Sequence, residues 1–308
     1  MSAGRFAPSP TATLHLGNLR TALVAWAAAR SVGSAFMVRI EDMDTAACRP
    51  EHERSALVDL DRLGLHHDGP VLRQSERAEV YAAAIDRLIA DELTYPCYCT
   101  RREVLAEAAA AVAAPHGRAP GAYVGTCRTL GAAARAEREA AGRRPSLRVR
   151  AEGAVIGFVD RLAGERVGEV DDFIVRRADG TPAYNLAVVV DDATQGVQEV
   201  VRGDDLLDTT PRQILLTRLL GVDEPDYLHV PLVLGPDGER LAKRHGSVTL
   251  DEQLAGGRSI DDVVSMFAVS LGLAVVGENV TVDDVAARFD VARLSRRPWT
   301  LTDPDTAG

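Results

Sequence analysis

The segment Arg5–Asn18, RFAPSPTATLHLGN, decides the fold that we expect for this chain. A short run ending at Ala7 indicates a strand, the Pro-Ser-Pro-Thr stretch indicates a turn, and an apolar helical pattern follows at 19–30. His15 and Gly17 therefore lie where the helix begins. A helix N-terminus favours phosphate groups, and a glycine there lets a nucleotide approach the backbone. We predict an anion site at this junction, with His15 as a hydrogen-bond donor.

The residues after this segment continue the alternation of strand and helix. A second strand is expected at Ala35–Ile40, and helical periodicity follows at Glu51–Leu63 and Glu76–Leu93. This order predicts an α/β fold with a doubly wound parallel sheet of the Rossmann type. Sheets of that kind bind ligands beyond the carboxyl ends of their strands. Residues 5–9 and Glu41 occupy two such ends.

The chain changes character at about residue 96 and again at about residue 181. We expect the first half of the sheet in 1–95, an insertion in 96–180, the second half of the sheet in 181–235, and a loop followed by helices in 236–308. The insertion carries an alanine-rich helix, a Pro-Gly-rich loop, and strand-like runs at 146–149 and 167–175. Later strands are expected at 186–190, 198–201 and 230–234, and later helices at 210–220, 260–273 and 282–289.

Three of the four cysteines lie close together in the sequence. The cysteines are at positions 48, 97, 99 and 127, and the last three fall within 31 residues that begin Cys-Tyr-Cys. This spacing favours a metal over disulfides in a reduced compartment. A structural zinc ion takes four ligands, and His116 and Tyr123 are the candidates for the fourth; imidazole is the commoner ligand in general. Cys48 is isolated and is expected to serve packing.

The N-terminal residues indicate neither a signal peptide nor a membrane anchor. The start MSAGRFAPSP has no basic region followed by an apolar stretch. The apolar run at 22–29 is shorter than the about 20 residues that a bilayer requires. We therefore expect a cytoplasmic protein that does not contact a membrane.

Charge is distributed unevenly along the chain. The net charge of −10 argues against a general nucleic-acid-binding protein, which needs a basic surface. Residues 101–150 nevertheless hold ten arginines and four glutamates, a local charge of +6, although such a run is often only a solvated helix face. Among the 35 basic residues, Lys243 is the only lysine. Because lysine is a compact, flexible charge suited to a phosphate, we expect a functional role for Lys243.

Two segments resemble the signatures of class I aminoacyl-tRNA synthetases. Residues 5–18 are similar to the segment that carries the His-Ile-Gly-His signature, and Arg-Phe-Ala-Pro-Ser-Pro-Thr resembles the glutamyl branch. Asn18 replaces the final histidine of that signature, and its amide can still donate a hydrogen bond. Residues 240–244, Arg-Leu-Ala-Lys-Arg, resemble the mobile Lys-Met-Ser-Lys-Ser loop, with Lys243 in place of the second lysine and Ala242 in place of the serine.

The resemblance implies an ATP site, with Mg²⁺ accompanying the nucleotide. His15, Gly17, Asn18 and Lys243 would bind ATP, and His15 and Lys243 would take part in catalysis. In this family the second lysine of the loop stabilises the charge that builds up on the phosphates as the adenylate forms.

The same resemblance implies a pocket for L-glutamate. The residues implied are Arg5, Ala7, Ser9, Glu41, Tyr184 and Arg202. The two arginines would bind the γ-carboxylate, Ser9 and Glu41 would hold the α-amino group, Tyr184 would line the pocket, and Ala7 would contribute backbone. Such a ligand requires a cation at one end and an anionic or polar group at the other. The acidic residues 42 and 44 are interpreted as capping residues or a magnesium site.

The resemblance also implies the fourth zinc ligand and the partner. In the truncated members of the family a tyrosine four residues before the last cysteine binds the metal, so Cys97, Cys99, Tyr123 and Cys127 would hold one structural Zn²⁺. Only 65 residues follow Lys243, too few for the large anticodon-binding domain of full-length glutamyl enzymes. This pattern resembles the glutamyl-queuosine enzymes, which form glutamyl adenylate without tRNA and attach glutamate to queuosine in the anticodon of tRNA(Asp).

We therefore expect a monomer whose partners are ATP, L-glutamate and the anticodon stem-loop of tRNA(Asp), with the arginines of 101–150 as phosphate contacts. Two alternatives remain open. One is a truncated enzyme that charges the 3′ end of tRNA(Glu), and the other is a non-catalytic glutamate or nucleotide sensor.

Overall fold

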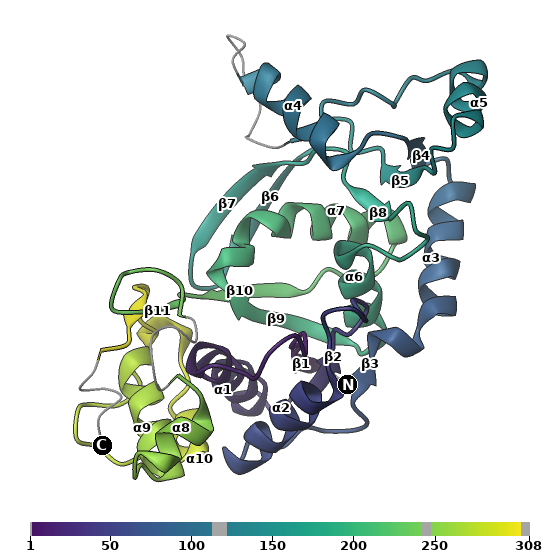
Figure 1. Ribbon diagram of the computed structural model, residues 1–308. Helices are drawn as coiled ribbons and strands as arrows, with labels where there is room; N and C mark the ends of the chain where they lie inside the picture. The colour runs from purple at the N-terminus through teal and green to yellow at the C-terminus, as the bar shows by residue number, and fades with distance from the viewer. Residues whose placement is uncertain (1, 113–121, 242–247, 303–308) are drawn as a thin grey trace.

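The fold is built on one large, mostly parallel sheet (Figure 1), seen in a computed structural model that describes residues 2–112, 122–241 and 248–302. Its seven strands lie in the order β3-β2-β1-β9-β10-β6-β7. Their bounds are β1 (Ala3–Phe6), β2 (Ala35–Ile40), β3 (Leu72–Arg73), β6 (Val155–Asp160), β7 (Gly164–Glu169), β9 (Val197–Gly203) and β10 (Asp226–Val230). Neighbouring strands pair in parallel except β6 and β7, which form an antiparallel edge. The expected α/β class is confirmed.

Helices cover both faces of this sheet, and each face has its own hydrophobic core. One core contains α1 (Leu16–Ser31), α2 (Pro50–Arg62), α9 (Ile260–Leu271) and α10 (Val282–Ala287), and the other contains α3 (Ala78–Ala90), α6 (Tyr184–Thr194) and α7 (Thr210–Leu220). Consecutive residues point to opposite faces: Val200 lies in the second core, whereas Val201 lies in the first. This alternation is the period of two that a strand buried on both faces requires, and it makes the sheet doubly wound.

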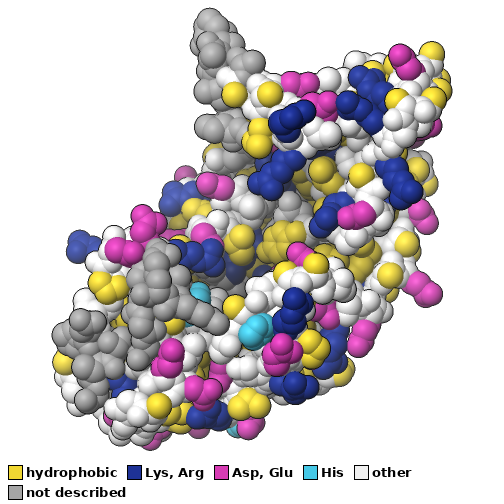
Figure 2. Space-filling view, viewed as in Figure 1, with side chains coloured by type: hydrophobic (Ala, Val, Ile, Leu, Met, Phe, Trp, Pro, Cys, Tyr) yellow, Lys and Arg dark blue, Asp and Glu magenta, His cyan; other side chains and the backbone are white. Residues whose placement is uncertain are grey.

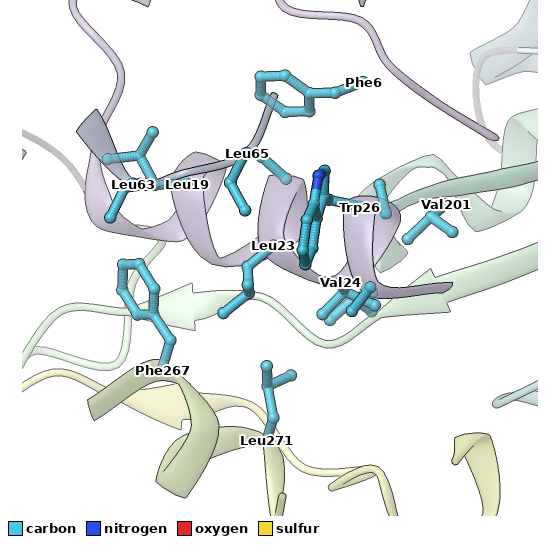
Figure 3. Packing of buried hydrophobic residues seen from close by; sticks show 14 of the residues in the cluster. Phe6, Leu19, Leu23, Val24, Trp26, Leu63, Leu65, Val201, Phe267 and Leu271 are labelled. Atoms are coloured by element: carbon cyan, nitrogen blue, oxygen red, sulfur yellow. The ribbon is translucent and has the colours of Figure 1, made fainter. Parts of the chain in front are cut away.

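The helix α1 lies at the centre of the first core (Figure 3). Leu19, Leu23 and Trp26 project from it toward Phe267 and Leu271 of α9 and toward residues of the sheet. Eleven of its sixteen residues are buried, including a row of alanines that lets the sheet approach closely. The strand–turn–helix junction expected at 5–18 is therefore anchored by packing on the helix that follows it.

A smaller lobe lies at one end of the molecule, at the top of Figure 1. It contains an antiparallel sheet, β4 (Thr94–Cys97), β5 (Ser146–Val149) and β8 (Ile174–Arg176), and the helices α4 (Arg101–Val112) and α5 (Ala132–Ala140). The remaining elements are the 3-10 turns η1 (Gln74–Glu76), η2 (Asp204–Thr209) and η4 (Val291–Arg293), the helix α8 (Leu250–Ala255), and the strand pair β11 (Val233–Leu234) with β12 (Trp299–Thr300).

Three expectations about secondary structure were wrong. The run at 230–234 is not one strand, because β10 ends at Val230 and β11 begins at Val233 in a different sheet. Residues 186–190 form part of α6 and not a strand. Five consecutive apolar residues do not distinguish a buried helix from a buried strand by periodicity, and the β-branched valines favoured the wrong choice. The run at 167–175 is divided: its first part ends β7 in the large sheet, and its last part begins β8 in the small one. The strands of 96–180 are thus shared between two sheets, and the domain limits remain a prediction.

No helix in the described ranges is both long and apolar enough to span a bilayer.

A buried guanidinium group holds α1 to its neighbours. The Nε of Arg20 donates to Ser270 Oγ at 2.8 Å, Nη1 donates to the Pro231 carbonyl at 3.0 Å, and Nη2 donates to the Ser270 carbonyl at 3.4 Å. Burial, opposed by the charge of Asp204, lowers the pKa of Arg20 to about 10. Arg20 therefore connects the first helix to α9 and to the chain just after β10.

We expect Arg20→Met to lower the free energy of unfolding by about 2–4 kcal/mol, because one buried and two partly buried acceptors lose their donors. Arg30 lies on the same helix, and its ion pair with Asp68 is partly exposed. Arg30→Met should therefore cost about 1 kcal/mol or less. Urea denaturation of both variants measures the difference. Equal losses of unfolding free energy in the two variants would show that the contacts of Arg20 stabilise the fold no more than an exposed ion pair does.

Candidate functional site

A pocket of about 500 Å³ opens at the carboxyl ends of β1 and β9. These strands are neighbours in the sheet although about two thirds of the chain separates them. The pocket is lined by every described residue that we had assigned to ATP or glutamate: Arg5, Ala7, Ser9, His15, Gly17, Asn18, Glu41, Tyr184 and Arg202. Lys243, Ala242 and His116 lie outside the described residues. The structure thus brings the predicted side chains together, while their roles remain predictions.

The start of α1 is held by a reciprocal pair of hydrogen bonds between His15 and Asn18. The Asn18 N–H donates to His15 Nδ1 at 3.3 Å, and the His15 N–H donates to Asn18 Oδ1 at 3.2 Å. Burial and then the charge of Arg240 lower the pKa of His15 to about 4. The imidazole is therefore neutral at pH 7, and since Nδ1 is an acceptor, its proton is on Nε2.

This geometry explains how Asn18 can stand where the family signature has a histidine. The amide oxygen of Asn18 accepts the backbone N–H of His15, and within the described ranges the amide nitrogen has no hydrogen-bond acceptor, so it can donate to a ligand at the helix N-terminus. The same arrangement favours a glycine at position 17, because a side chain there would crowd its neighbours. A Cβ at position 17 would lie 3.0 Å from the His15 ring and 3.2 Å from Val233 Cβ.

Arg5 enters the pocket from β1, and it is almost fully buried. Its Nη1 donates to the Val201 carbonyl at 2.7 Å, and its Nε donates to Asp192 Oδ1 at 3.3 Å. Asp192 also accepts a 2.5 Å hydrogen bond from Arg39 Nη1. Burial raises the pKa of Asp192, but the charges of Arg39 and Arg5 outweigh burial, so the net pKa is lowered and the carboxylate is ionised. One carboxylate thus serves two buried guanidinium groups.

Arg202 enters from β9 and differs from Arg5 in its partners. Its Nε donates to His229 Nε2 at 3.0 Å, Nη1 to Gln213 Oε1 at 2.6 Å, and Nη2 to Thr210 Oγ1 at 2.9 Å. All three acceptors are neutral, and within the described ranges no carboxylate forms an ion pair with Arg202. Burial lowers the pKa of Arg202. A buried cation without a directly bound carboxylate is costly, which favours an anionic ligand beside it.

The acidic residues that follow β2 have different surroundings. Glu41 lines the pocket, and its backbone N–H donates to the Pro8 carbonyl at 3.0 Å, which holds the loop after β1 beside the end of β2. Burial raises the pKa of Glu41 against the opposing charge of Arg39. Asp42 accepts from the backbone and the hydroxyl of Ser75, and Asp44 accepts from two backbone N–H groups of its own turn. Both therefore cap local structure.

The small lobe brings the three cysteines of the 97–127 region together. Their sulfur atoms lie within 4.8 Å of one another, and Cys99 Sγ is 3.5 Å from Cys127 Sγ. Tyr123 Oη is 3.5 Å from Cys97 Sγ and accepts the Cys127 N–H at 2.7 Å. Two thiolates on a tetrahedral zinc ion lie about 3.8 Å apart, so the donor atoms fit such an ion. The group is nearly closed to solvent, as a structural metal site requires.

The nine described arginines of residues 101–150 do not form one uniform surface. Arg148 is buried, with its guanidinium 3.8 Å above the Tyr123 ring, and Arg128 pairs with Asp172 at 2.6 Å. Arg143 pairs with Glu103 at 3.0 Å. Exposed arginines without an ion pair among the described residues remain at positions 101, 102 and 144. Figure 2 shows Lys and Arg side chains around the hollow between this lobe and the rest of the molecule.

The sequence interpretation missed the residues that hold the two pocket arginines. Asp192, Thr210, Gln213 and His229 are all buried and contact Arg5 or Arg202. A histidine within an apolar strand and an acidic pair after an apolar run were the available signals. Neither signal identifies its partner, because the contacts cross between strands and helices that are distant in sequence.

Comparison with known proteins agrees with this geometry. Residues 3–305 match the family described as tRNA synthetases class I (E and Q), catalytic domain. A protein named glutamyl-Q tRNA(Asp) synthetase from Nocardia farcinica (strain IFM 10152) is 55% identical over 301 residues, which are 98% of this chain and 93% of that protein. A protein of the same name from Symbiobacterium thermophilum is 49% identical over 97% of this chain and 95% of its own length.

Solved structures show the same fold. The crystal structure of a glutamate tRNA ligase from Elizabethkingia meningosepticum CCUG26117, in complex with its amino acid, superposes with a TM-score of 0.84 at 25% identity, covering 99% of this chain and 68% of that chain. The resemblance seen at residues 5–18 is thereby confirmed over almost the whole length. The chain belongs to the class I tRNA synthetases of the E and Q branch, a family of ligases.

Proposed function

We propose that this protein activates L-glutamate with ATP, without requiring tRNA, and transfers the glutamyl group to queuosine in the anticodon of tRNA(Asp). The observation that carries the first step is the pair of buried guanidinium groups, Arg5 and Arg202, that line the same pocket as the N-terminus of α1. The acceptor is supported by the names of the relatives at 55% and 49% identity.

Arg5 and Arg202 bind the γ-carboxylate of glutamate in this proposal. Arg202 has three neutral acceptors, so each of its terminal nitrogens keeps one N–H for a ligand. At the other end of the pocket, Glu41 and Ser9 hold the α-ammonium group, Ala7 offers backbone, and Tyr184 forms a wall. Glutamine would leave Arg202 without a direct anionic partner, which gives a physical reason for selecting the acid.

ATP lies against the N-terminus of α1, where Gly17 keeps the backbone open and His15 Nε2–H and the Asn18 amide donate to phosphate oxygens. The α-carboxylate of glutamate attacks the α-phosphorus, the bond to the bridging oxygen breaks, and pyrophosphate leaves. Lys243, assigned by resemblance, stabilises the charge on the departing phosphates. Mg²⁺ bound with ATP supplies further neutralisation of that charge.

The three cysteines and Tyr123 hold one structural Zn²⁺ in this proposal. Burial raises the pKa of the Tyr123 phenol, so a metal is required for it to bind as phenolate. The site lies in the small lobe, so its role is to fix that lobe and not to take part in adenylate formation.

The proposal predicts glutamate-dependent ATP–pyrophosphate exchange in the absence of tRNA. Arg5→Leu should reduce kcat/KM for glutamate by about 100-fold or more and leave ATP binding unchanged, because a buried charge contact to the carboxylate is lost. Lys243→Ala should slow the exchange at saturating glutamate. Exchange that appears only after tRNA(Glu) is added would favour the charging enzyme, and none under any condition would favour the sensor.

The exposed arginines of the small lobe predict a second, separable effect. The Arg101→Ala, Arg144→Ala double variant should weaken tRNA(Asp) binding and make the plot of log K against log salt shallower by about 2, since each lost phosphate contact removes about one unit. Glutamate exchange should not change. Arg54→Ala, which removes an exposed arginine from α2, is the matched control. An equal effect of the control would refute an RNA surface on this lobe.

Metal content distinguishes the candidate zinc ligands. The purified chain should contain one zinc ion, and Tyr123→Phe should weaken its affinity about 10-fold or more while Cys48→Ser does not. Cys97→Ser should release the ion and make the small lobe sensitive to protease, with glutamate exchange retained. Unchanged zinc affinity in Tyr123→Phe would assign the fourth ligand elsewhere, with His116 as the next residue to test.

A further inference from the structure

We propose that Asp160 and His229 form a relay that positions Arg202, and that this relay sets the affinity of the pocket for glutamate. The inference rests on the proposed role of Arg202 in binding the side-chain carboxylate. It adds two positioning residues that do not line the pocket.

The relay begins at Asp160, the last residue of β6, which is almost fully buried. One carboxylate oxygen, Oδ1, accepts the backbone N–H groups of Leu162 at 2.9 Å and Ala163 at 2.7 Å. The other, Oδ2, accepts the backbone N–H of His229 at 3.0 Å and its ring Nδ1–H at 2.6 Å. Four donors thus fix both the orientation and the ionised state of this carboxylate.

His229 transmits this orientation to Arg202. Because Nδ1 carries the proton that is donated to Asp160, Nε2 has a lone pair, and it accepts the Nε–H of Arg202 at 3.0 Å. The hydroxyl of Thr210 lies 3.2 Å from the same Nε2. The opposite tautomer would place two N–H donors against each other. The imidazole is therefore an acceptor for Arg202 only while Asp160 holds its other nitrogen.

The pairing of three parallel strands determines the geometry of the relay. His229 of β10 is directly opposite Arg202 of β9, and Tyr227 of β10 is opposite Asp160 of β6. Residues directly opposite in neighbouring strands point to the same face of the sheet, which brings the imidazole and the guanidinium together. A change of register by one residue would separate them.

The relay explains how Arg202 is held without being neutralised. Arg5 and Arg39 contact the Asp192 carboxylate directly, at 3.3 and 2.5 Å. A direct carboxylate on Arg202 would compete with the carboxylate of the substrate. The neutral ring of His229 separates Asp160 from Arg202, so that the anion orients the chain of hydrogen bonds while the positive charge of Arg202 remains available to a ligand.

The test compares His229→Leu with His229→Gln in glutamate–ATP exchange and in direct glutamate binding by calorimetry. His229→Leu removes the acceptor and should raise the KM and Kd for glutamate about 10-fold or more, with the KM for ATP little changed. His229→Gln places an amide oxygen near the position of Nε2 and should restore most of the affinity. Thr217→Val is the matched control, because Thr217 is equally buried on α7 but, in the described part of the chain, its hydroxyl donates only to the Gln213 carbonyl.

A double-mutant cycle separates the relay from the proposed pocket. If His229 acts through Arg202, then His229→Leu should have no further effect on glutamate once Arg202→Gln is present. Full glutamate affinity in His229→Leu, a loss that His229→Gln does not relieve, or an equal loss in Thr217→Val would overturn the relay alone. Normal glutamate affinity in Arg202→Gln would overturn the proposal that Arg202 binds the side-chain carboxylate, and it would overturn the relay as well.

Discussion

The parallel pairing of β1 with β9 is the constraint on which the rest of the site depends. Arg5 and Arg202 are separated by almost two hundred residues, and this pairing places both at the carboxyl ends of two central strands. At this point in the sheet, strands from the first half of the chain meet strands from the second half. Two guanidinium groups so close together repel each other, and both are buried. The fold tolerates this arrangement only because each group has fixed partners and because the pocket between them admits an anion.

The helix α6 supplies the counter-charges for this cluster. Its last turns carry Asp191 and Asp192, both buried, and each accepts hydrogen bonds from its own set of partners, although Arg39 also lies 3.9 Å from Asp191. Asp191 accepts from Gln74, Arg77 and Tyr81, and it thereby attaches α3 to the core. Asp192 serves Arg5 and Arg39. Only a helix can present neighbouring residues about 100° apart in this way, whereas a strand would send them to opposite faces.

Arg202 differs from Arg5 and Arg39, because its hydrogen-bond partners are neutral. It lies in the pocket, where an anionic ligand can pair with it. A binding site for a carboxylate has to be complete before the ligand arrives, so that little reorganisation is required when it binds. His229, Thr210 and Gln213 hold the guanidinium in place, while its charge is left for the ligand. The neutral His15 at the start of α1 follows a similar logic, because its ring is fixed by Asn18 and its remaining N–H is left for the pocket.

The sequence by itself determined the features that depend on neighbouring residues. The turn and helix start at residues 5–18, the helix at 210–220 and the cluster of cysteines could be predicted, because caps, glycines and short spacings act within a few residues. Tertiary structure alone decided that 186–190 is a helix and that β6 and β7 extend the large sheet. It also decided that Asp160 reaches Arg202 through His229. These features depend on strand register and on which faces are buried, and such long-range pairing leaves no local pattern in the chain.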